Sequence, residues 1–304
     1  MKKIYVFLCL AGFLFYEDVA AQQDPQYTQY MYNMNVVNPA YAGSKESLSI
    51  GILGRQQWSG FDGAPETFTF SAHSPIGEKT GLGLSAISDK YGPVNETNIY
   101  ADFSYTLNLG SATKLAFGIK AGATFHDVGL IGLELQNSTD IAFSENTNET
   151  FANIGAGFFL YSDKYYVGFS VPNFIKSTHL TVDGTEIGSE VNHFFATAGY
   201  VFQLSPNTKF KPSTLVKTAF GAPVSFDVNA NFLFYDRFEI GASYRLDDAV
   251  SGLVNFRITD WVQAGFAYDH VLSDINEQAS ASYEAFLIFD IFFNQKVYRS
   301  PRFF

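Results

Sequence analysis

The residues that most often do chemistry in enzymes are scattered along this chain. Its five histidines belong to no recognisable catalytic or metal-binding spacing, and they are His73, His126, His179, His193 and His270. The sequence contains no Gly-x-Ser-x-Gly elbow, P-loop, His-Glu-x-x-His pair or dinucleotide fingerprint in its proper context. A Ser/His/Asp set can be drawn only arbitrarily. We therefore predict no catalytic residues, no cofactor and no enzyme activity.

One acidic stretch, residues 127–149, has oxygen ligands of the kind that Ca²⁺ prefers. It has no Lys or Arg, and its carboxylates are Asp127, Glu134, Asp140, Glu145 and Glu149. The spacing of an EF-hand is absent. A solvated acidic loop is the favoured interpretation, and no metal site is predicted.

The composition narrows the class of protein. Aromatic residues make up 17% of the 304 residues and charged residues only 16%, with a formal net charge of −11. A nucleic-acid-binding protein usually presents a basic face, so this charge argues against nucleic acid as a partner.

The first 21 residues have the features of a secretory signal peptide. Lys2 and Lys3 precede an apolar run, 4–16, which is shorter than the roughly 20 residues that a spanning helix needs. Val19-Ala20-Ala21 then predicts cleavage before Gln22. Cys9, the only cysteine, lies in this leader, so the mature chain has no thiol, disulfide or cysteine-based metal site.

The mature chain alternates apolar and polar residues with a period of two, which is typical of β-strands. The clearest stretches are 98–109, 114–126 and 224–235. The pattern predicts fourteen strands, at 46–58, 66–74, 80–88, 97–109, 113–126, 150–161, 164–171, 191–203, 208–219, 223–235, 237–246, 250–258, 261–270 and 281–293. An even number of strands near the required length of about 9–11 residues favours a transmembrane outer-membrane β-barrel.

The links between the strands predict an orientation. Links after even-numbered strands are short, whereas several after odd-numbered strands are long, notably 127–149, 172–190 and 271–280. Outer-membrane barrels have short periplasmic turns and longer extracellular loops. We therefore expect the N-terminus in the periplasm and the long loops outside the cell. A soluble β-sandwich or propeller would also alternate, but it explains neither this asymmetry nor the Phe-rich and Leu-rich apolar faces.

Charged side chains of both signs fall on the predicted lumen face. They are Arg55, His73, Asp102, Lys114, Lys120, Asp227, Glu239, Arg245, Arg257, Asp269 and Glu284. Fourteen strands enclose enough space for water or for a plug. These residues either line a water-filled pore or pair across the lumen and around an inserted segment. We favour a filled or partly filled lumen.

The segment before the first strand, residues 22–44, predicts a short periplasmic helical or plug segment. Asp24-Pro25 resembles a helix N-cap followed by proline at the first helical position. One helical face then carries aromatic and methionine side chains: Tyr27, Tyr30, Met31 and Met34. Asn38-Pro39 turns the chain toward the barrel, which we assign to residues 45–304. The segment is a lid on the periplasmic mouth, a surface for docking a partner, or both. The candidate docking residues are Tyr27, Tyr30, Met31, Met34, Asn38 and Pro39.

Five stretches across the mature chain resemble the PorP/SprF family of type IX secretion system outer-membrane proteins of Bacteroidetes. They are "DPQYTQYMYNMNVVNPAYAG" at 24–43, "GRQQWSGFDGAPETFTFSAHSPI" at 54–76, "KPSTLVK" at 211–217, "NANFLFYDRFEIGASYR" at 229–245 and "SPRFF" at 300–304. The first two are the most specific.

The resemblance implies an outer-membrane barrel, in contact with lipid and without enzymatic activity. It implies a role in secreting or attaching a large surface protein, including adhesins for gliding motility. It also implies partners in the periplasmic type IX machinery or among peptidoglycan-binding proteins. The alternatives are a channel for small or apolar solutes and an outer-membrane hydrolase.

Overall fold

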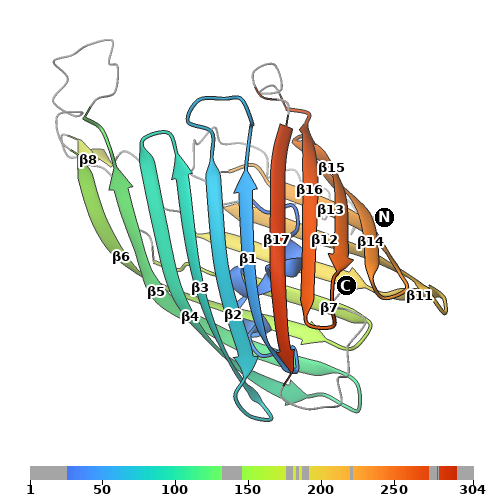
Figure 1. The fold of residues 1–304 in the computed structure, drawn as a ribbon. Helices are drawn as coiled ribbons and strands as arrows, with labels where there is room; N and C mark the ends of the chain where they lie inside the picture. Colours follow the sequence, from blue (N-terminus) through green and yellow to red (C-terminus); the bar gives the residue numbers. More distant parts are fainter. Residues whose placement is uncertain are drawn as a thin grey trace, which may run out of the picture.

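In the computed structural model, the chain forms a closed antiparallel barrel of fourteen strands (Figure 1). The structure describes residues 26–131, 146–175, 181–182, 185–186, 192–219, 222–273, 279 and 281–292. The predicted leader, residues 1–21, and most of the acidic stretch lie outside these residues. Neighbouring strands pair in chain order, and pairing of the first strand with the last closes the wall.

Each of the fourteen predicted strands corresponds to one strand of the wall, which confirms the predicted fold. These strands are β1 (Ser47–Gln56), β2 (Glu66–Pro75), β3 (Thr80–Tyr91), β4 (Val94–Asn108), β5 (Lys114–Val128), β6 (Thr147–Tyr161), β7 (Tyr165–Val171), β10 (His193–Tyr200), β12 (Thr208–Ala219), β13 (Ser225–Phe234), β14 (Phe238–Arg245), β15 (Ala249–Arg257), β16 (Val262–Val271) and β17 (Ala281–Phe292). In addition, β11 (Phe202–Ser205) extends a hairpin with β12, and β8 (Thr181–Val182) pairs only with β9 (Thr185–Glu186).

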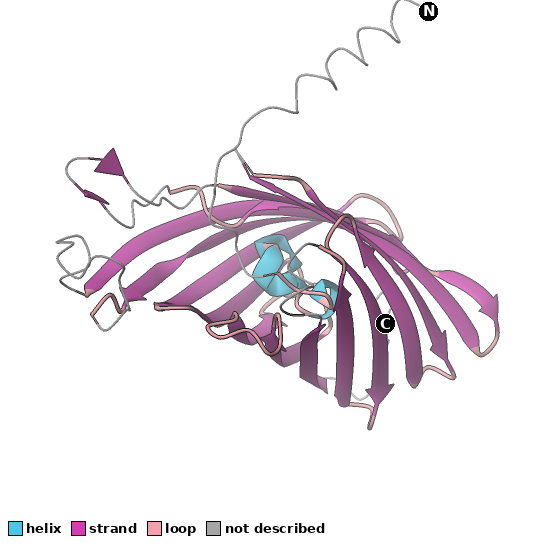
Figure 2. Ribbon diagram, turned by 90° about the horizontal axis from the view of Figure 1, so that it is seen from above, coloured by secondary structure: helices cyan, strands magenta, loops and turns pink. Residues whose placement is uncertain are grey.

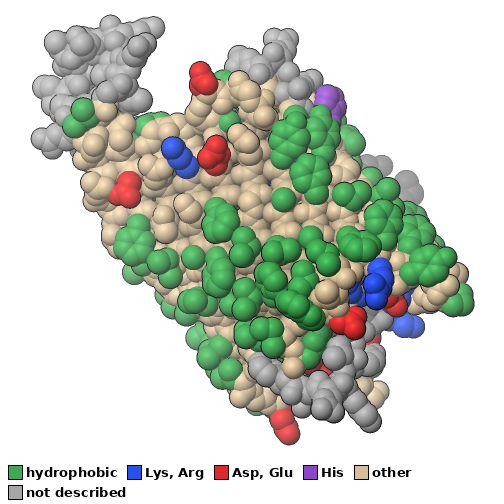
Figure 3. Space-filling model, viewed as in Figure 1, with side chains coloured by type: hydrophobic (Ala, Val, Ile, Leu, Met, Phe, Trp, Pro, Cys, Tyr) green, Lys and Arg blue, Asp and Glu red, His purple; other side chains and the backbone are tan. Residues whose placement is uncertain are grey.

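The period of two in the sequence becomes two chemically different faces of the wall, because successive side chains on a strand point to opposite sides. On β5, Phe117 and Ile119 are 50% and 62% exposed on the outer face, whereas Lys120 beside them is 2% exposed on the inner face. Figure 3 shows hydrophobic side chains gathered on the outside of the wall, with few charged side chains among them. The wall is therefore apolar outside and polar inside.

The two ends of the barrel differ in their links. One end, the short-turn end, has the links 76–79, 109–113, 162–164, 201–207, 235–237 and 258–261. The other end, the long-loop end, has the links 57–65, 92–93, 129–146, 172–192, 220–224, 246–248 and 272–280. β1 begins at the short-turn end and runs toward the long-loop end.

Residues 26–44 lie inside the barrel and form three short helical pieces (Figure 2). These are η1 (Tyr30–Tyr32) and η2 (Pro39–Tyr41), both 3₁₀ turns, and the single α-helical turn α2 (Met34–Val37). The predicted short helical or plug segment is present, but it consists of three short pieces and not of one amphipathic helix. Its polar side chains are as buried as its apolar ones, so contacts to the wall on all sides replace the regular pattern of one helix. None of the helices in the described residues is both long and apolar enough to cross a membrane.

Candidate functional site: the filled lumen

Residues Gln26–Ser44, which we call the plug, run the length of the lumen. At the long-loop end, Gln26 Nε2 donates to Ser225 Oγ at the start of β13, at 2.9 Å. At the short-turn end, the Gly43 amide donates to His73 Nδ1, at 3.2 Å. Just beyond the plug, Lys45 pairs with Asp290 near the end of β17. The plug therefore enters β1 from the end opposite to Gln26.

A buried ion network holds the first part of the plug. The guanidinium of Arg55 bonds to Glu284 at 3.0 Å and to Asp269 at 2.8 Å. The same carboxylates receive the plug: the amides of Thr28 and Gln29 donate to Glu284, and the Thr28 hydroxyl donates to Asp269. These side chains are at most 4% exposed. Hydrogen bonds to ionised groups are roughly twice as strong as neutral ones, so this network fixes the plug in position.

A second buried ion pair lies beside the first. Arg245 Nε donates to Asp227 at 2.9 Å, and its Nη2 reaches the backbone carbonyl oxygen of Tyr27 at 3.5 Å. The Tyr27 hydroxyl also bonds to Thr69 Oγ1, at 2.9 Å. The plug thus interacts with β1, β2, β13, β14, β16 and β17 within its first few residues.

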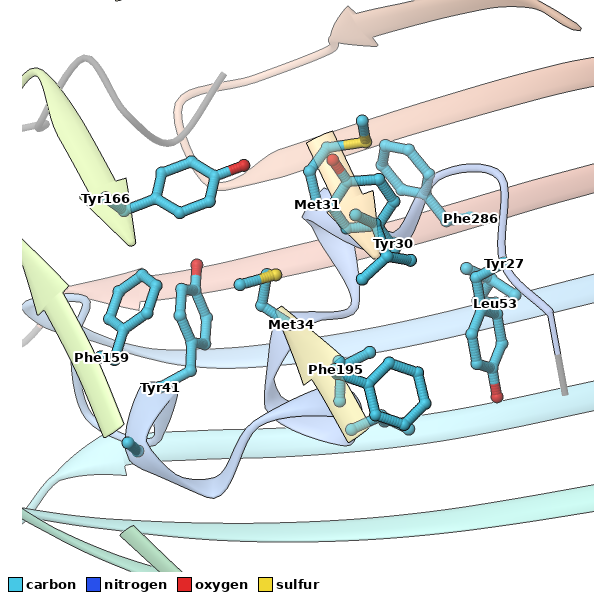
Figure 4. Packing of buried hydrophobic residues seen from close by; sticks show 14 of the residues in the cluster. Tyr27, Tyr30, Met31, Met34, Tyr41, Leu53, Phe159, Tyr166, Phe195 and Phe286 are labelled. Carbon is cyan, nitrogen blue, oxygen red and sulfur yellow. The ribbon is translucent and has the colours of Figure 1, made fainter. Parts of the chain in front are cut away.

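The middle of the plug packs against apolar residues of the inner wall (Figure 4). Tyr30 is fully buried, and Tyr32 stacks on Phe286 with ring centroids 4.5 Å apart. The Tyr32 hydroxyl donates to Glu239, and Lys211 lies 5.5 Å from the centre of its ring. Tyrosine suits this position, since one end of its side chain is apolar and the other is polar.

Close backbone contacts hold the last part of the plug. A Cβ atom built on Gly118 would lie closer than 3.0 Å to the backbone nitrogen of Ala40. One built on Gly81 would meet the carbonyl oxygen of Ala42 just as closely. Only glycine allows two backbones to approach in this way. Hydrogen bonds complete the fit, because Ser104 Oγ donates to the Ala42 carbonyl oxygen at 2.6 Å.

Asn38 links this last part to the short-turn end of the wall. Its Oδ1 accepts from the Ala40 amide and caps η2, and its Nδ2 donates to the Phe158 carbonyl oxygen at 3.0 Å. The Ser170 hydroxyl donates to the neighbouring Val37 carbonyl oxygen, at 2.7 Å. These bonds satisfy backbone groups that the short helical pieces leave unpaired.

All six predicted docking residues are buried inside the barrel, and they are Tyr27, Tyr30, Met31, Met34, Asn38 and Pro39. In this structure they contact the wall and present no external surface. The predicted helical or plug segment is therefore a plug that fills the lumen, and not a lid on one mouth of the barrel.

The predicted placement of the N-terminal segment and the short turns on the same side of the membrane needs a correction as well. The sequence placed both the short turns and everything before β1 in the periplasm, but Gln26 and the short turns lie at opposite ends. Residues 26–44 run back along the lumen, a path that the direction of β1 alone does not reveal.

Nine of the eleven predicted lumen charges are buried on the inner face: Arg55, His73, Asp102, Lys120, Asp227, Glu239, Arg245, Asp269 and Glu284. They pair with one another and around the plug, as the second of the two predicted arrangements required. Lys114 and Arg257 instead lie near the short-turn rim, where Arg257 donates to the Asp236 carbonyl oxygen.

The sequence analysis missed several contacts that position the plug, notably those of Thr28, Gly81 and Gly118. A glycine on the lumen face of a strand signals a close approach of another backbone. Gly118 lies on the same face as Lys114 and Lys120, so that signal was present in the sequence. In the part of the chain that the structure describes, no three His, Cys, Asp or Glu side chains are placed to hold a metal ion.

These features define the class of protein. A closed antiparallel barrel that is apolar outside and polar inside spans a membrane with strands, and the chain is an outer-membrane β-barrel. Its fold is similar to that of CymD, a monoaromatic hydrocarbon channel, with a TM-score of 0.53, 11% identity, and coverage of 86% of this chain and 93% of CymD. The Ralstonia pickettii toluene transporter TbuX gives a TM-score of 0.53, 10% identity and the same two coverages. At these identities the likeness is one of fold alone.

The sequence also identifies the family. The model of the type IX secretion system membrane protein PorP/SprF matches residues 19–289, and the chain belongs to this family. No curated protein matches the chain in sequence.

Proposed function

We propose that this protein is an accessory barrel of the type IX secretion system. It supports the secretion or surface anchoring of a cognate large surface protein, such as an adhesin for gliding motility. It also docks to periplasmic components of the machinery or to peptidoglycan-binding proteins.

The filled lumen carries this proposal. The plug is bonded to the wall near both ends, by Thr28 and Gln29 to Glu284 and by Asn38 to Phe158. A barrel filled in this way acts through its rims and its outer wall and does not serve as the conduit for a protein. Family membership supplies the secretion system in which that role is exercised.

The direct test is deletion of the gene, followed by surface labelling and identification of the displayed proteins. We expect one large surface protein to disappear from the cell surface and return on complementation, while nutrient uptake stays normal. Normal display of every large surface protein in the deletion strain would overturn the proposal.

A channel for small or apolar solutes is the competing function, and it requires an open path. The purified barrel in planar bilayers should show no discrete conductance, and liposomes that contain it should not accumulate apolar solutes. Steady conductance of the intact chain would favour the channel over the secretion role.

The orientation in the outer membrane belongs to the same proposal: the long loops face outward and the short turns face the periplasm. Residues 1–21 are removed as a signal peptide. Asp62→Cys in the 57–65 link should react with an impermeant maleimide on intact cells, whereas Ser111→Cys in the 109–113 link should not. Cys9, the chain's only cysteine, is lost with the leader in this scheme, so the introduced cysteine is the one thiol that can be labelled. The mass of the mature protein checks that it begins at Gln22.

Docking by the plug itself is a separate part of the proposal, because the six residues must leave the lumen to meet a partner. Replacing Tyr27, Tyr30 and Met31 with Ser should reduce secretion and partner recovery more than barrel insertion. If the triple variant secretes and recovers partners at the wild-type level, the docking role is lost and the plug only fills the lumen.

A further inference from the structure

A cavity of about 900 Å³ opens at the long-loop end, above the plug. Its walls come from the 57–65 link, the β3–β4 turn and the 246–248 link, and Gln26 of the plug contributes to its lining. Pockets that bind small molecules usually measure about 300–1,000 Å³, so this cavity suits a short chain segment and is too small for a folded domain. Since the plug blocks the lumen beneath it, the cavity is a recess and not a channel entrance.

Backbone hydrogen bonds between neighbouring links fix the rim of this cavity. The Gly92 amide donates to the Gly63 carbonyl oxygen at 2.9 Å, which joins the β3–β4 turn to the 57–65 link. The Leu272 amide donates to the Asp248 carbonyl oxygen at 2.7 Å, which joins two further links. The Trp58 amide is held by Ser282 Oγ at 3.1 Å. A rim held in place before binding lowers the entropy cost of holding a ligand.

The chemistry of the lining is aromatic and acidic. Trp58, Phe61 and Tyr91 supply ring faces, and the carboxylates are Asp89, Asp247 and Asp248. Among the described residues of the lining, Arg245 is the one cationic side chain, and its charge is already bound by Asp227 at 2.9 Å and by Asp248 at 3.2 Å. The recess therefore presents net negative charge beside aromatic rings. A cation is attracted both by carboxylates and by the faces of aromatic rings.

We propose that this recess binds a short peptide segment that presents a Lys or Arg side chain next to an apolar residue, from the surface protein that the barrel serves. The inference rests on the proposed function, since it names the kind of segment that the barrel recognises. The cationic side chain lies between Asp247 and the aromatic rings, and the apolar neighbour packs against Phe61. The plug forms the base of the recess and prevents the segment from passing through.

Fluorescence of Trp58 tests the inference. The chain has only two tryptophans, so Trp261→Phe at the short-turn end leaves Trp58 as the single reporter. The purified full barrel in detergent is titrated with two capped tetrapeptides, Gly-Phe-Lys-Gly and Gly-Phe-Glu-Gly. We expect a saturable change with the lysine peptide and an apparent affinity at least about tenfold weaker for the glutamate peptide.

The double variant Asp247→Asn/Asp248→Asn should weaken binding of the lysine peptide at least about fivefold. Glu78→Gln, which removes an exposed carboxylate in the 76–79 link, should leave binding unchanged. Unaltered mobility of unheated samples in gel electrophoresis confirms that each variant is folded. Equal binding of the two peptides, no saturation with either, or undiminished binding by the folded double variant would each overturn the inference.

The outcome is distinguishable from failure of the proposed function. Loss of surface display in the deletion strain without peptide binding would overturn the recess and leave the secretion role standing. Peptide binding with normal surface display in the deletion strain would overturn the secretion role and leave the recess standing as a peptide-binding site.

Discussion

The two halves of the plug are held in the lumen by different physical means. The half near the long-loop end, around Thr28 and Gln29, which we call the outer half, is bound by side-chain charge, with Arg55 and Glu284 at the centre of the network. The inner half, from Asn35 to Gly43, is bound by shape, with glycines of the wall admitting its backbone. The glycine contacts admit the plug backbone in one position, because a side chain on the glycine would overlap it. The inner half therefore defines the register of the plug, and the outer half adds charge-assisted hydrogen bonds to the wall.

The largest effect should come from breaking the charged half with Glu284→Ala. The variant leaves Arg55 with one fewer partner in a buried site and removes the acceptor of two plug amides, which predicts a loss of about 3–5 kcal/mol in the free energy of unfolding. Urea denaturation of the detergent-solubilised barrel measures it. The exposed Glu78→Ala is the matched control and should change stability by no more than about 0.5 kcal/mol. Similar stabilities for the two variants would contradict the assigned role of the network.

A single added methyl group on a glycine of the wall should displace the inner half of the plug. Gly118→Ala places a Cβ against the Ala40 backbone, so the inner half must shift, at a cost of about 1–3 kcal/mol. A cysteine introduced at Val36, which is 7% exposed in the wild type, should react faster with maleimide in this variant. Gly252→Ala on the outer face has open space around it and should leave the labelling rate unchanged. Equal labelling rates in the two variants would show that the glycine contact does not set the register.

A smaller effect is expected where the outer half uses a neutral hydrogen bond. Tyr27→Phe removes the hydroxyl that bonds to Thr69 and keeps the ring in place, so it should lower the free energy of unfolding by about 0.5–1.5 kcal/mol. Tyr235→Phe, at a position 72% exposed, serves as its control. A loss for Tyr27→Phe as large as that for Glu284→Ala would mean that charge does not dominate the outer half.

The smallest effect should come from an ion pair outside the plug altogether. Lys209 pairs with Asp236 at the short-turn rim, where the aspartate side chain is 62% exposed. Solvent screens such a pair, so Lys209→Ala should change stability by about 0–1 kcal/mol. Thermal unfolding of this variant beside Glu284→Ala should show the smaller loss for the exposed pair, and equal losses would contradict the comparison.

The wall of this protein could be predicted from its sequence, but the path of the plug could not. A strand with one apolar and one polar face alternates apolar and polar residues with a period of two. The fourteen stretches with that period correspond to the fourteen strands of the wall. The plug sequence has no comparable alternation of apolar and polar residues. The spacing of Tyr27, Tyr30, Met31 and Met34 indicated one buried helical face, yet Gln29 is as buried as Tyr30. In a lumen with polar walls, polarity no longer distinguishes a buried side chain from an exposed one.

The pairing of β1 with β17 has a consequence for the order in which the molecule assembles. Arg55 and Glu284 are cross-strand partners in this closing pair, and Glu284 also accepts the amides of Thr28 and Gln29. β17 thus completes its ionic contacts only when the first described residues of the chain are in place. Closure of the barrel and capture of its own N-terminal segment are coupled events. Each of the two therefore stabilises the other, because both place a partner on Glu284.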